Sequence, residues 1–244
     1  MIGLIVLLAI AVIGLGIYFA RLAYLAQQKR QQEFLDVARE HSLTFDPASR
    51  RGFDREHPQF ECFAQGHSRR ALNLLRGRIP GSEEPTLSCT LGDYEYKITT
   101  SNGKSTTTVT YRFGFVIIET PWNGMPDMLV RREGLFDKLA GFLGFDDIDF
   151  ESAEFSRTFM VKCKEKRFAY DMIDAQMMEF LMVNEPAPPN IDIGGHAICL
   201  WYGPRKRLEP RALIALMQWG DRFVRRWPRV LRAQLNERNQ PRED

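Results

Sequence analysis

Three side chains in the segment 93–97 have the types and spacing of part of a metal-dependent nuclease site. Asp93, Glu95 and Lys97 alternate along the chain, so on a β-strand they would share one face. In such sites carboxylates hold Mg²⁺, while a lysine steadies the attacking water or the phosphate. The chemistry also requires an acidic partner on a neighbouring strand, and the same alternation fits a plain exposed strand face. These residues are the candidate catalytic residues.

A second acidic segment offers candidate metal ligands. Asp147, Asp149 and Glu151 are also two residues apart, and oxygen ligands of this kind suit Ca²⁺ or Mg²⁺. An EF-hand loop would place glycine at its sixth position and glutamate at its twelfth, where Ser152 and Thr158 stand. The segment therefore lacks the frame of that motif. Solvated surface carboxylates are the alternative interpretation.

The other motifs of this kind are incomplete. Gly103-Lys104-Ser105 resembles the end of a phosphate-binding loop, but Ile98 stands where that motif needs its first glycine. The sequence has no Gly-x-Ser-x-Gly elbow. No pair of histidines has metal-ligand spacing, and no two cysteines form Cys-x-x-Cys. We therefore expect no cofactor.

Basic residues gather at the C-terminal end. Residues 201–244 contain 11 Lys/Arg and 5 Asp/Glu, and Arg205, Lys206 and Arg207 stand together. Basic clusters near a membrane bind anionic lipid headgroups. Base-stacking aromatics are not interleaved among these charges, so no nucleic-acid partner is expected. We predict headgroup contact for Arg205, Lys206 and Arg207.

A membrane is expected because of the N-terminus. Residues 1–20 contain no charged side chain, and about 20 apolar residues suffice to cross a bilayer. A cleaved signal peptide would have a basic start, a shorter apolar run and small residues at its end, whereas this run ends in Tyr18-Phe19-Ala20. We interpret it as one uncleaved transmembrane helix. Arg21, Lys29 and Arg30 follow it, which predicts a cytoplasmic soluble domain in a cell-membrane protein.

The elements that must position these residues follow from local patterns. Good helix formers predict that the membrane helix continues as a stalk, which Asp46-Pro47 would stop. Segments rich in β-branched and aromatic residues predict strands, and Asn102-Gly103 in the link 101–105 predicts a long hairpin between the last two of them. The predicted strands of this half are residues 71–75, 86–91, 94–100 and 106–120.

The second half of the chain mixes element types. Apolar spacing predicts helices over residues 135–143 and 167–182, the latter with a break near Asp174, and a strand over residues 154–163. Gly194-Gly195 predicts a second hairpin. Pro210 begins a long amphipathic helix, and the chain is expected to fray after Pro228.

Together these elements predict an α+β fold with a mostly antiparallel sheet, packed helices, an N-terminal transmembrane helix and a helical stalk. The expected division places the membrane helix first, the stalk second, a β-rich half third, an α+β half fourth and a flexible tail last. Its boundaries are residues 1–20, 21–46, 47–126, 127–230 and 231–244.

Several short segments of residues 70–185, rather than one motif, carry a resemblance to a known family. They are Gly92-Asp93-Tyr94-Glu95-Tyr96, the Thr-rich hairpin, Asp147-Ile148-Asp149-Phe150-Glu151-Ser152, Phe155, Phe159-Met160-Val161 and Phe168-Ala169-Tyr170. In these segments the chain resembles an uncharacterised bacterial family of membrane-anchored α+β domains of unknown function. The resemblance implies a membrane-anchored α+β domain and brings no activity or site residue.

The function that the sequence predicts is binding or scaffolding by a cytoplasmic domain on a single-pass anchor, with no protein partner specified. The alternative is a membrane-tethered hydrolase or nuclease that uses the carboxylates described above. A pocket lined by several of those carboxylates would favour the enzyme. Carboxylates turned to solvent on a shallow surface would favour the binding module.

Overall fold

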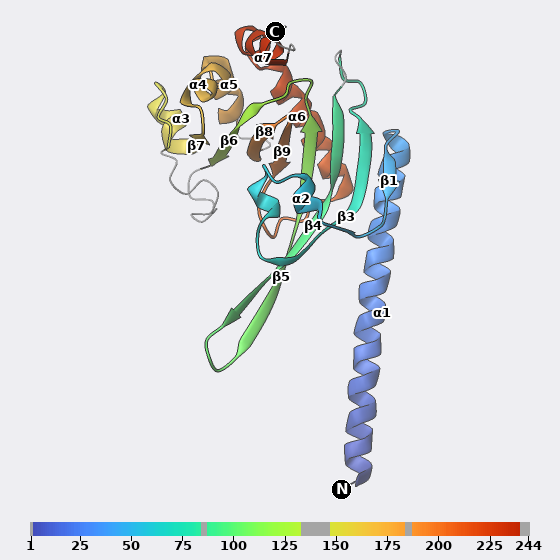
Figure 1. Cartoon of the computed structure of the whole chain (residues 1–244). Coiled ribbons are helices and arrows are strands. Elements are labelled where there is room, and N and C mark those ends of the chain that lie inside the picture. Colours follow the sequence, from blue (N-terminus) through green and yellow to red (C-terminus); the bar gives the residue numbers. More distant parts are fainter. Residues whose placement is uncertain (1, 84–86, 133–146, 184–186, 240–244) are drawn as a thin grey trace, which may run out of the picture.

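The computed structural model describes residues 2–83, 87–132, 147–183 and 187–239. Its centre is a nine-stranded sheet in the order β1-β3-β4-β5-β9-β8-β6-β7, with β2 also paired to β3. Every described strand pair is antiparallel. Helices join this sheet, and a long apolar helix stands at the N-terminus (Figure 1). The predicted α+β class is confirmed.

The elements divide between the two halves of the chain. The first half contains α1 (Ile2–Glu40), β1 (Thr44–Asp46), β2 (Arg50–Arg51), α2 (Phe53–Glu56), the short 3₁₀ helix η1 (Glu61–Phe63), β3 (His67–Arg78), β4 (Ser88–Ser101), β5 (Thr106–Glu119) and β6 (Met125–Arg132). The second half contains α3 (Ala153–Thr158), β7 (Phe159–Cys163), α4 (Lys166–Met172), α5 (Ala175–Met182), β8 (Asn190–Gly195), β9 (Ala197–Trp201), α6 (Pro210–Arg225) and α7 (Arg229–Asn239).

The helix α1 is continuous from the apolar N-terminus into the domain (Figure 1). Its side chains from Ile10 to Lys29 are exposed, whereas Phe34, Val37 and Ala38 are buried. The last turns of α1 therefore belong to the hydrophobic core. The segment expected to be a helical stalk, residues 21–46, is helical only to Glu40, and its second half packs on the sheet.

The sheet buries a different set of side chains on each face. Along β5, Val116 and Ile118 lie in the core that includes α1 and α6, while Phe113 and Phe115 lie in an aromatic core with α2 and η1. This alternation follows from the two-residue period of a strand. A residue's position along β4 or β5 thus decides which core it meets.

The hairpin between β4 and β5 forms where Asn102-Gly103 predicts it. The Asn102 Oδ1 accepts hydrogen bonds from the backbone N–H groups of Lys104 and Ser105, and Gly103 has a φ of 80° that favours glycine. The segments expected as two strands, 86–91 and 94–100, are joined in one strand, β4, which begins at Ser88. Its outer part and that of β5 are exposed and extend on the same side of the domain as the N-terminal part of α1 (Figure 1).

The segment 154–163 is only partly a strand, which corrects the sequence prediction. Ser152 caps a helix by accepting a hydrogen bond from the Phe155 N–H at 3.2 Å, so residues up to Thr158 are helical before β7 begins. The expected break near Asp174 is confirmed, since Asp174 caps α5 through the Met177 N–H. The predicted helix over 135–143 lies outside the described residues. Strand β6 had no predicted counterpart.

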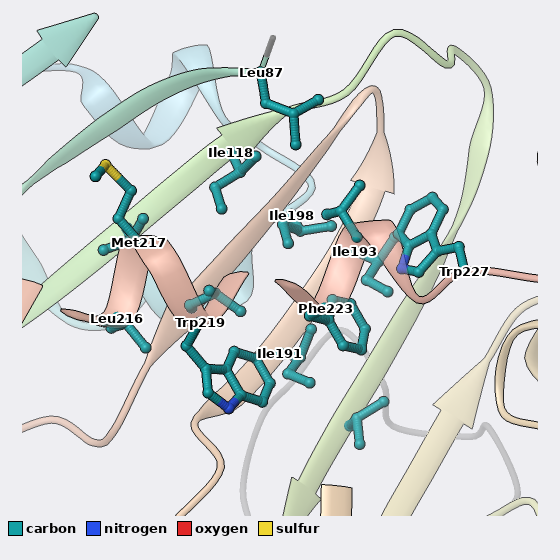
Figure 2. Packing of buried hydrophobic residues seen from close by; sticks show 14 of the residues in the cluster. Leu87, Ile118, Ile191, Ile193, Ile198, Leu216, Met217, Trp219, Phe223 and Trp227 are labelled. Carbon is teal, nitrogen blue, oxygen red and sulfur yellow. The ribbon is translucent and has the colours of Figure 1, made fainter. Parts of the chain in front are cut away.

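The helix α6 begins at Pro210, as predicted, and packs closely on the sheet. Its apolar side chains, among them Met217 and Phe223, lie against isoleucines of the strands (Figure 2). Gly220 makes the close approach possible, because a Cβ there would lie 2.5 Å from Ile118 and 2.6 Å from Leu200. The amphipathic pattern of this segment therefore indicates a helix whose apolar face packs in the core.

The chain does not fray directly after Pro228. Residues 229–239 form α7, and Leu231 and Leu235 are each only 1% exposed. The two leucines are four residues apart and so lie on one helix face. The prediction of a flexible tail was wrong for this helix, since Leu231 and Leu235 pack in the core and the Asn236 Oδ1 accepts a hydrogen bond from the Trp122 Nε1.

Candidate functional site

The candidate catalytic carboxylates lie in the interior. Asp93 and Glu95 stand on β4 on the face that α1 covers, and each is 1% exposed. The predicted common face of the two residues is therefore present, but it faces inward. Two buried charges of the same sign need compensating partners, because burial without them costs several kcal/mol for each ion.

Asp93 is held by residues from three distant parts of the chain. Arg30 of α1 donates from Nη2 to Oδ1 at 2.7 Å and from Nε to Oδ2 at 3.0 Å. Arg207 donates from Nη2 to Oδ2 at 3.0 Å. Asn73, which has a φ of 52° at a bulge in β3, donates from Nδ2 to the same oxygen at 2.9 Å. The bidentate contact between Arg30 and Asp93 links α1 to the sheet.

Glu95 is held by its two neighbours across the sheet. Arg70 on β3 donates to Oε1 from Nε at 2.9 Å and from Nη2 at 2.6 Å, and Arg112 on β5 donates from Nε to Oε2 at 2.5 Å. Both arginines are in direct register with Glu95. We call Arg30, Arg70, Arg112 and Arg207, together with Asp93 and Glu95, the arginine row.

The arginine row keeps both carboxylates ionised. Burial by itself would raise the pKa of Asp93, but the hydrogen bonds and charges of Arg30 and Arg207 outweigh it and lower that pKa below its ordinary value. Arg112 and Arg70 lower the pKa of Glu95 in the same way against the effect of burial. Every carboxylate oxygen accepts at least one hydrogen bond from an arginine. A metal ion would have to displace these arginines.

Lys97 stands on the same face as the two carboxylates but beyond the buried part of β4. It lines a small pocket of about 270 Å³ with Arg51, Arg69 and Arg70. The structure therefore surrounds Lys97 with positive charge, apart from Glu95. This is not the metal-centred setting that the nuclease interpretation requires.

The second acidic segment is exposed. Asp147, Asp149 and Glu151 face solvent, while Ile148 and Phe150 between them are buried. Asp147 lies 3.5 Å from the Lys162 Nζ. Within the described part of the chain, no group of three His, Cys, Asp or Glu side chains is placed to hold a metal ion. The alternation was predicted, but it presents the carboxylates outward.

The three adjacent basic residues do not form one surface. The Arg205 guanidinium lies 4.9 Å over the ring of Tyr111, on the aromatic-core face of the sheet. Arg207 lies on the opposite face, bonded to Asp93. The Lys206 backbone pairs with the Gly114 N–H at 3.1 Å. Residues 205–207 thus cross from one face of β5 to the other, and Arg207 belongs to the arginine row.

A groove of about 390 Å³ opens beside the arginine row, between α1 and the sheet. Its lining includes Ala23, Ala26 and Gln27 from α1, and Arg70, Arg112, Arg207 and Glu95 from the sheet side. Three arginines and one carboxylate therefore face this space. Of the three, Arg112 has the most exposed side chain, at 51%.

A further buried ion pair was not suggested by the sequence. Arg131 on β6 and Asp192 on β8 are 0% and 2% exposed, and the Arg131 Nη2 lies 3.4 Å from the Asp192 Oδ1. The Arg131 guanidinium also stacks 5.0 Å over Trp201. Burial raises the pKa of Asp192 in spite of the opposing charge of Arg131. The sequence predicted no strand before Arg131, so no local pattern indicated this ion pair.

One sequence signal bears on part of the arginine row. The hairpin around Asn102-Gly103 pairs Ser101 with Thr106, and the same register pairs Glu95 with Arg112. The sequence predicted that the two strands pair but not their register, because a two-residue turn at Asn102-Gly103 would place Glu95 opposite Thr110. Arg30 is 63 residues from Asp93 and Arg207 is 114 residues away, so no local pattern could have indicated them.

The fold and these contacts define a class of protein: an α+β domain on a long N-terminal helix that has the length and composition to cross a membrane. No protein-family model and no curated protein sequence matches the chain. Among solved structures, the mycobacterial trehalose monomycolate transport factor A, TtfA, is similar with a TM-score of 0.52 at 11% sequence identity. The match covers 81% of this chain and 96% of that one, and at this identity it shows a shared fold.

Proposed function

We propose that the protein is a single-pass membrane protein whose α+β domain works by binding or scaffolding, with the domain on the cytoplasmic side. The observation that carries the proposal is the continuity of α1. Its exposed apolar part suits a bilayer, and its last turns are fixed in the domain by Phe34 and by the Arg30–Asp93 contact. A helix built in this way would hold the domain at a fixed height and orientation above the membrane.

The arginine row supports binding over the hydrolase alternative. In a metal-dependent hydrolase the carboxylates would be open to a cation, whereas here arginines occupy Asp93 and Glu95. Asp147, Asp149 and Glu151 are turned to solvent and do not share a pocket. The mycobacterial protein of similar fold is a transport factor. A binding role is compatible with that likeness, and no cargo is carried over to this chain.

Deleting residues 2–20 should move the protein from the membrane fraction to the soluble fraction. The described side chains in that stretch are exposed, so the deletion removes none of their contacts from the core. The measurement is fractionation of cell lysates after a high-salt wash and after detergent. Fusing an unrelated transmembrane segment to the truncated chain should return it to the membrane. A truncated protein that still needs detergent would show that a second attachment exists.

Topology can be read from a single cysteine at the hairpin tip, Lys104→Cys. The native Cys62, Cys89, Cys163 and Cys199 are buried, and burial raises their pKa values, to about 12 for Cys89 and about 11 for Cys163. A thiol reagent attacked by thiolate should therefore modify only the new residue. With a cytoplasmic domain, an impermeant maleimide labels the variant after lysis and not in intact cells. Labelling of intact cells would place the domain outside, and the parent chain is the control.

A further inference from the structure

The groove beside the arginine row lies at a defined height above the proposed membrane span. Ala23, Ala26 and Gln27 follow the last residue of the apolar run, Ala20, by three to seven positions. At 1.5 Å per residue this is about 5–10 Å along the helix axis. The headgroup layer of a bilayer begins where the hydrocarbon ends and is several Å deep on each side. The groove is therefore level with lipid headgroups.

The chemistry of the groove suits a phosphate. Arg112 uses only its Nε on Glu95, and its terminal nitrogens have no hydrogen-bond partner among the described residues. Arg207 lines the same space and is one-third exposed. The arginine row holds four arginines for two buried carboxylates, so positive charge remains in excess even with the exposed Glu209, 3.7 Å from Arg30. Planar guanidinium groups bind phosphate oxygens in pairs.

The apolar surroundings of the groove suit a lipid better than a soluble phosphate. Ala23, Ala26 and Leu72 line it, and below them on α1 stand the exposed side chains of Phe19 and Leu22. The acyl chains of a phospholipid whose phosphate is held by Arg112 would thus run along α1 into the bilayer. An ordinary soluble anion would gain nothing from that apolar path.

We infer that this groove is a binding site for the phosphate headgroup of an anionic phospholipid from the leaflet that α1 enters. The site rests on the proposed membrane anchor. It fixes the domain against the membrane surface at a second point. Of the three residues predicted to contact headgroups it keeps Arg207, and Arg112 takes the place of Arg205 and Lys206. The bound phosphate supplies the negative charge that the arginine row lacks.

The test uses the full chain in a neutral detergent, with phosphatidylglycerol and phosphatidylcholine of the same acyl chains as probes. The affinity for each lipid is measured by native mass spectrometry. Phosphatidylglycerol should bind at least about tenfold more tightly, and Arg112→Gln should remove about tenfold of that affinity, as expected for a charged hydrogen bond. Ala26→Trp fills the groove without changing any charge and should weaken binding to the same extent. Gln28→Trp, on a part of α1 that does not line the groove, is the control and should leave the affinity unchanged.

Several outcomes would overturn the inference. Equal affinity for the two lipids would do so, and so would unchanged phosphatidylglycerol binding in Ala26→Trp. That second variant decides the question if Arg112→Gln does not fold. Displacement of the lipid by equimolar inorganic phosphate would assign the site to a free phosphate instead. Membrane anchoring is tested separately, because Ala26→Trp keeps the apolar run and should remain in the membrane fraction.

Discussion

Asp93→Asn should lower the free energy of unfolding by about 3–5 kcal/mol, because it removes one partner of a buried ion pair and leaves the others uncompensated. The Arg30 side chain is 9% exposed, and it also contacts the Leu208 carbonyl oxygen, Glu209 and the ring of Phe34. In a domain of this size the loss corresponds to a fall in the unfolding midpoint of about 6–20 °C. All four tryptophans are buried, so their fluorescence in the full-length protein in detergent reports the transition.

The matched control is Asp147→Asn. Asp147 also forms an ion pair, but its side chain is 58% exposed, so the substitution should cost no more than about 1 kcal/mol. If Asp93→Asn cost as little as the control, the Arg30–Asp93 contact would not be what fixes α1 to the domain. The proposal that α1 holds the domain rigidly above the membrane would then lose its main support.

Asp93→Asn should also change how the stability of the domain depends on pH. Arg30 and Arg207 hold the pKa of Asp93 below its unfolded value, which is about 3.9. The contribution of this carboxylate is therefore fully present above the unfolded pKa and is lost as the pH falls through the lower folded pKa. The difference in stability between the parent and Asp93→Asn should be constant near neutral pH and should shrink in acid. A difference that grew in acid would contradict the direction of the shift.

Arg131→Met should also cost about 3–5 kcal/mol, because it leaves Asp192 buried without its cation. The double variant Arg131→Met/Asp192→Leu should recover most of that loss, since buried ion pairs are often replaced by apolar residues without cost. The geometry favours this result. The pair makes a single contact at 3.4 Å, and the Arg131 Nε and Nη1 and the Asp192 Oδ2 have no hydrogen-bond partner among the described residues.

The loss of stability in Arg131→Met should itself depend on pH. Without Arg131, burial acts on Asp192 with no opposing positive charge from that guanidinium and raises its pKa further. A carboxyl group whose pKa is raised on folding contributes stability below its unfolded pKa and loses it as the pH rises through the folded pKa. Arg131→Met should therefore be least destabilised in acid. Unfolding curves of the two variants at neutral and acidic pH make the measurement, and a double variant as unstable as the single one would show that Arg131 acts through Trp201 instead.

Local patterns in the sequence determined the parts of this fold that depend on neighbours in the chain. Asn102-Gly103 set the hairpin because Gly103 must adopt a positive φ and Asn102 caps the turn. Pro210 began α6, and the break at Asp174 followed from a side chain that caps the next helix. The unbroken apolar run predicted the N-terminal part of α1 as a helix. In each case the determining interaction lies within a few residues.

The tertiary structure alone decided where the charged residues lie and what they do. Asp93 is as polar in sequence as Asp147, yet one is buried by a helix from the other end of the chain and the other faces water. Arg205 and Arg207 are two residues apart and lie on opposite faces of the sheet. Which partner reaches a charge depends on strand order, register and helix docking, and these arise from contacts between residues far apart in the sequence. A charged residue carries no local mark of that choice, because the same side chain is stable either solvated or paired.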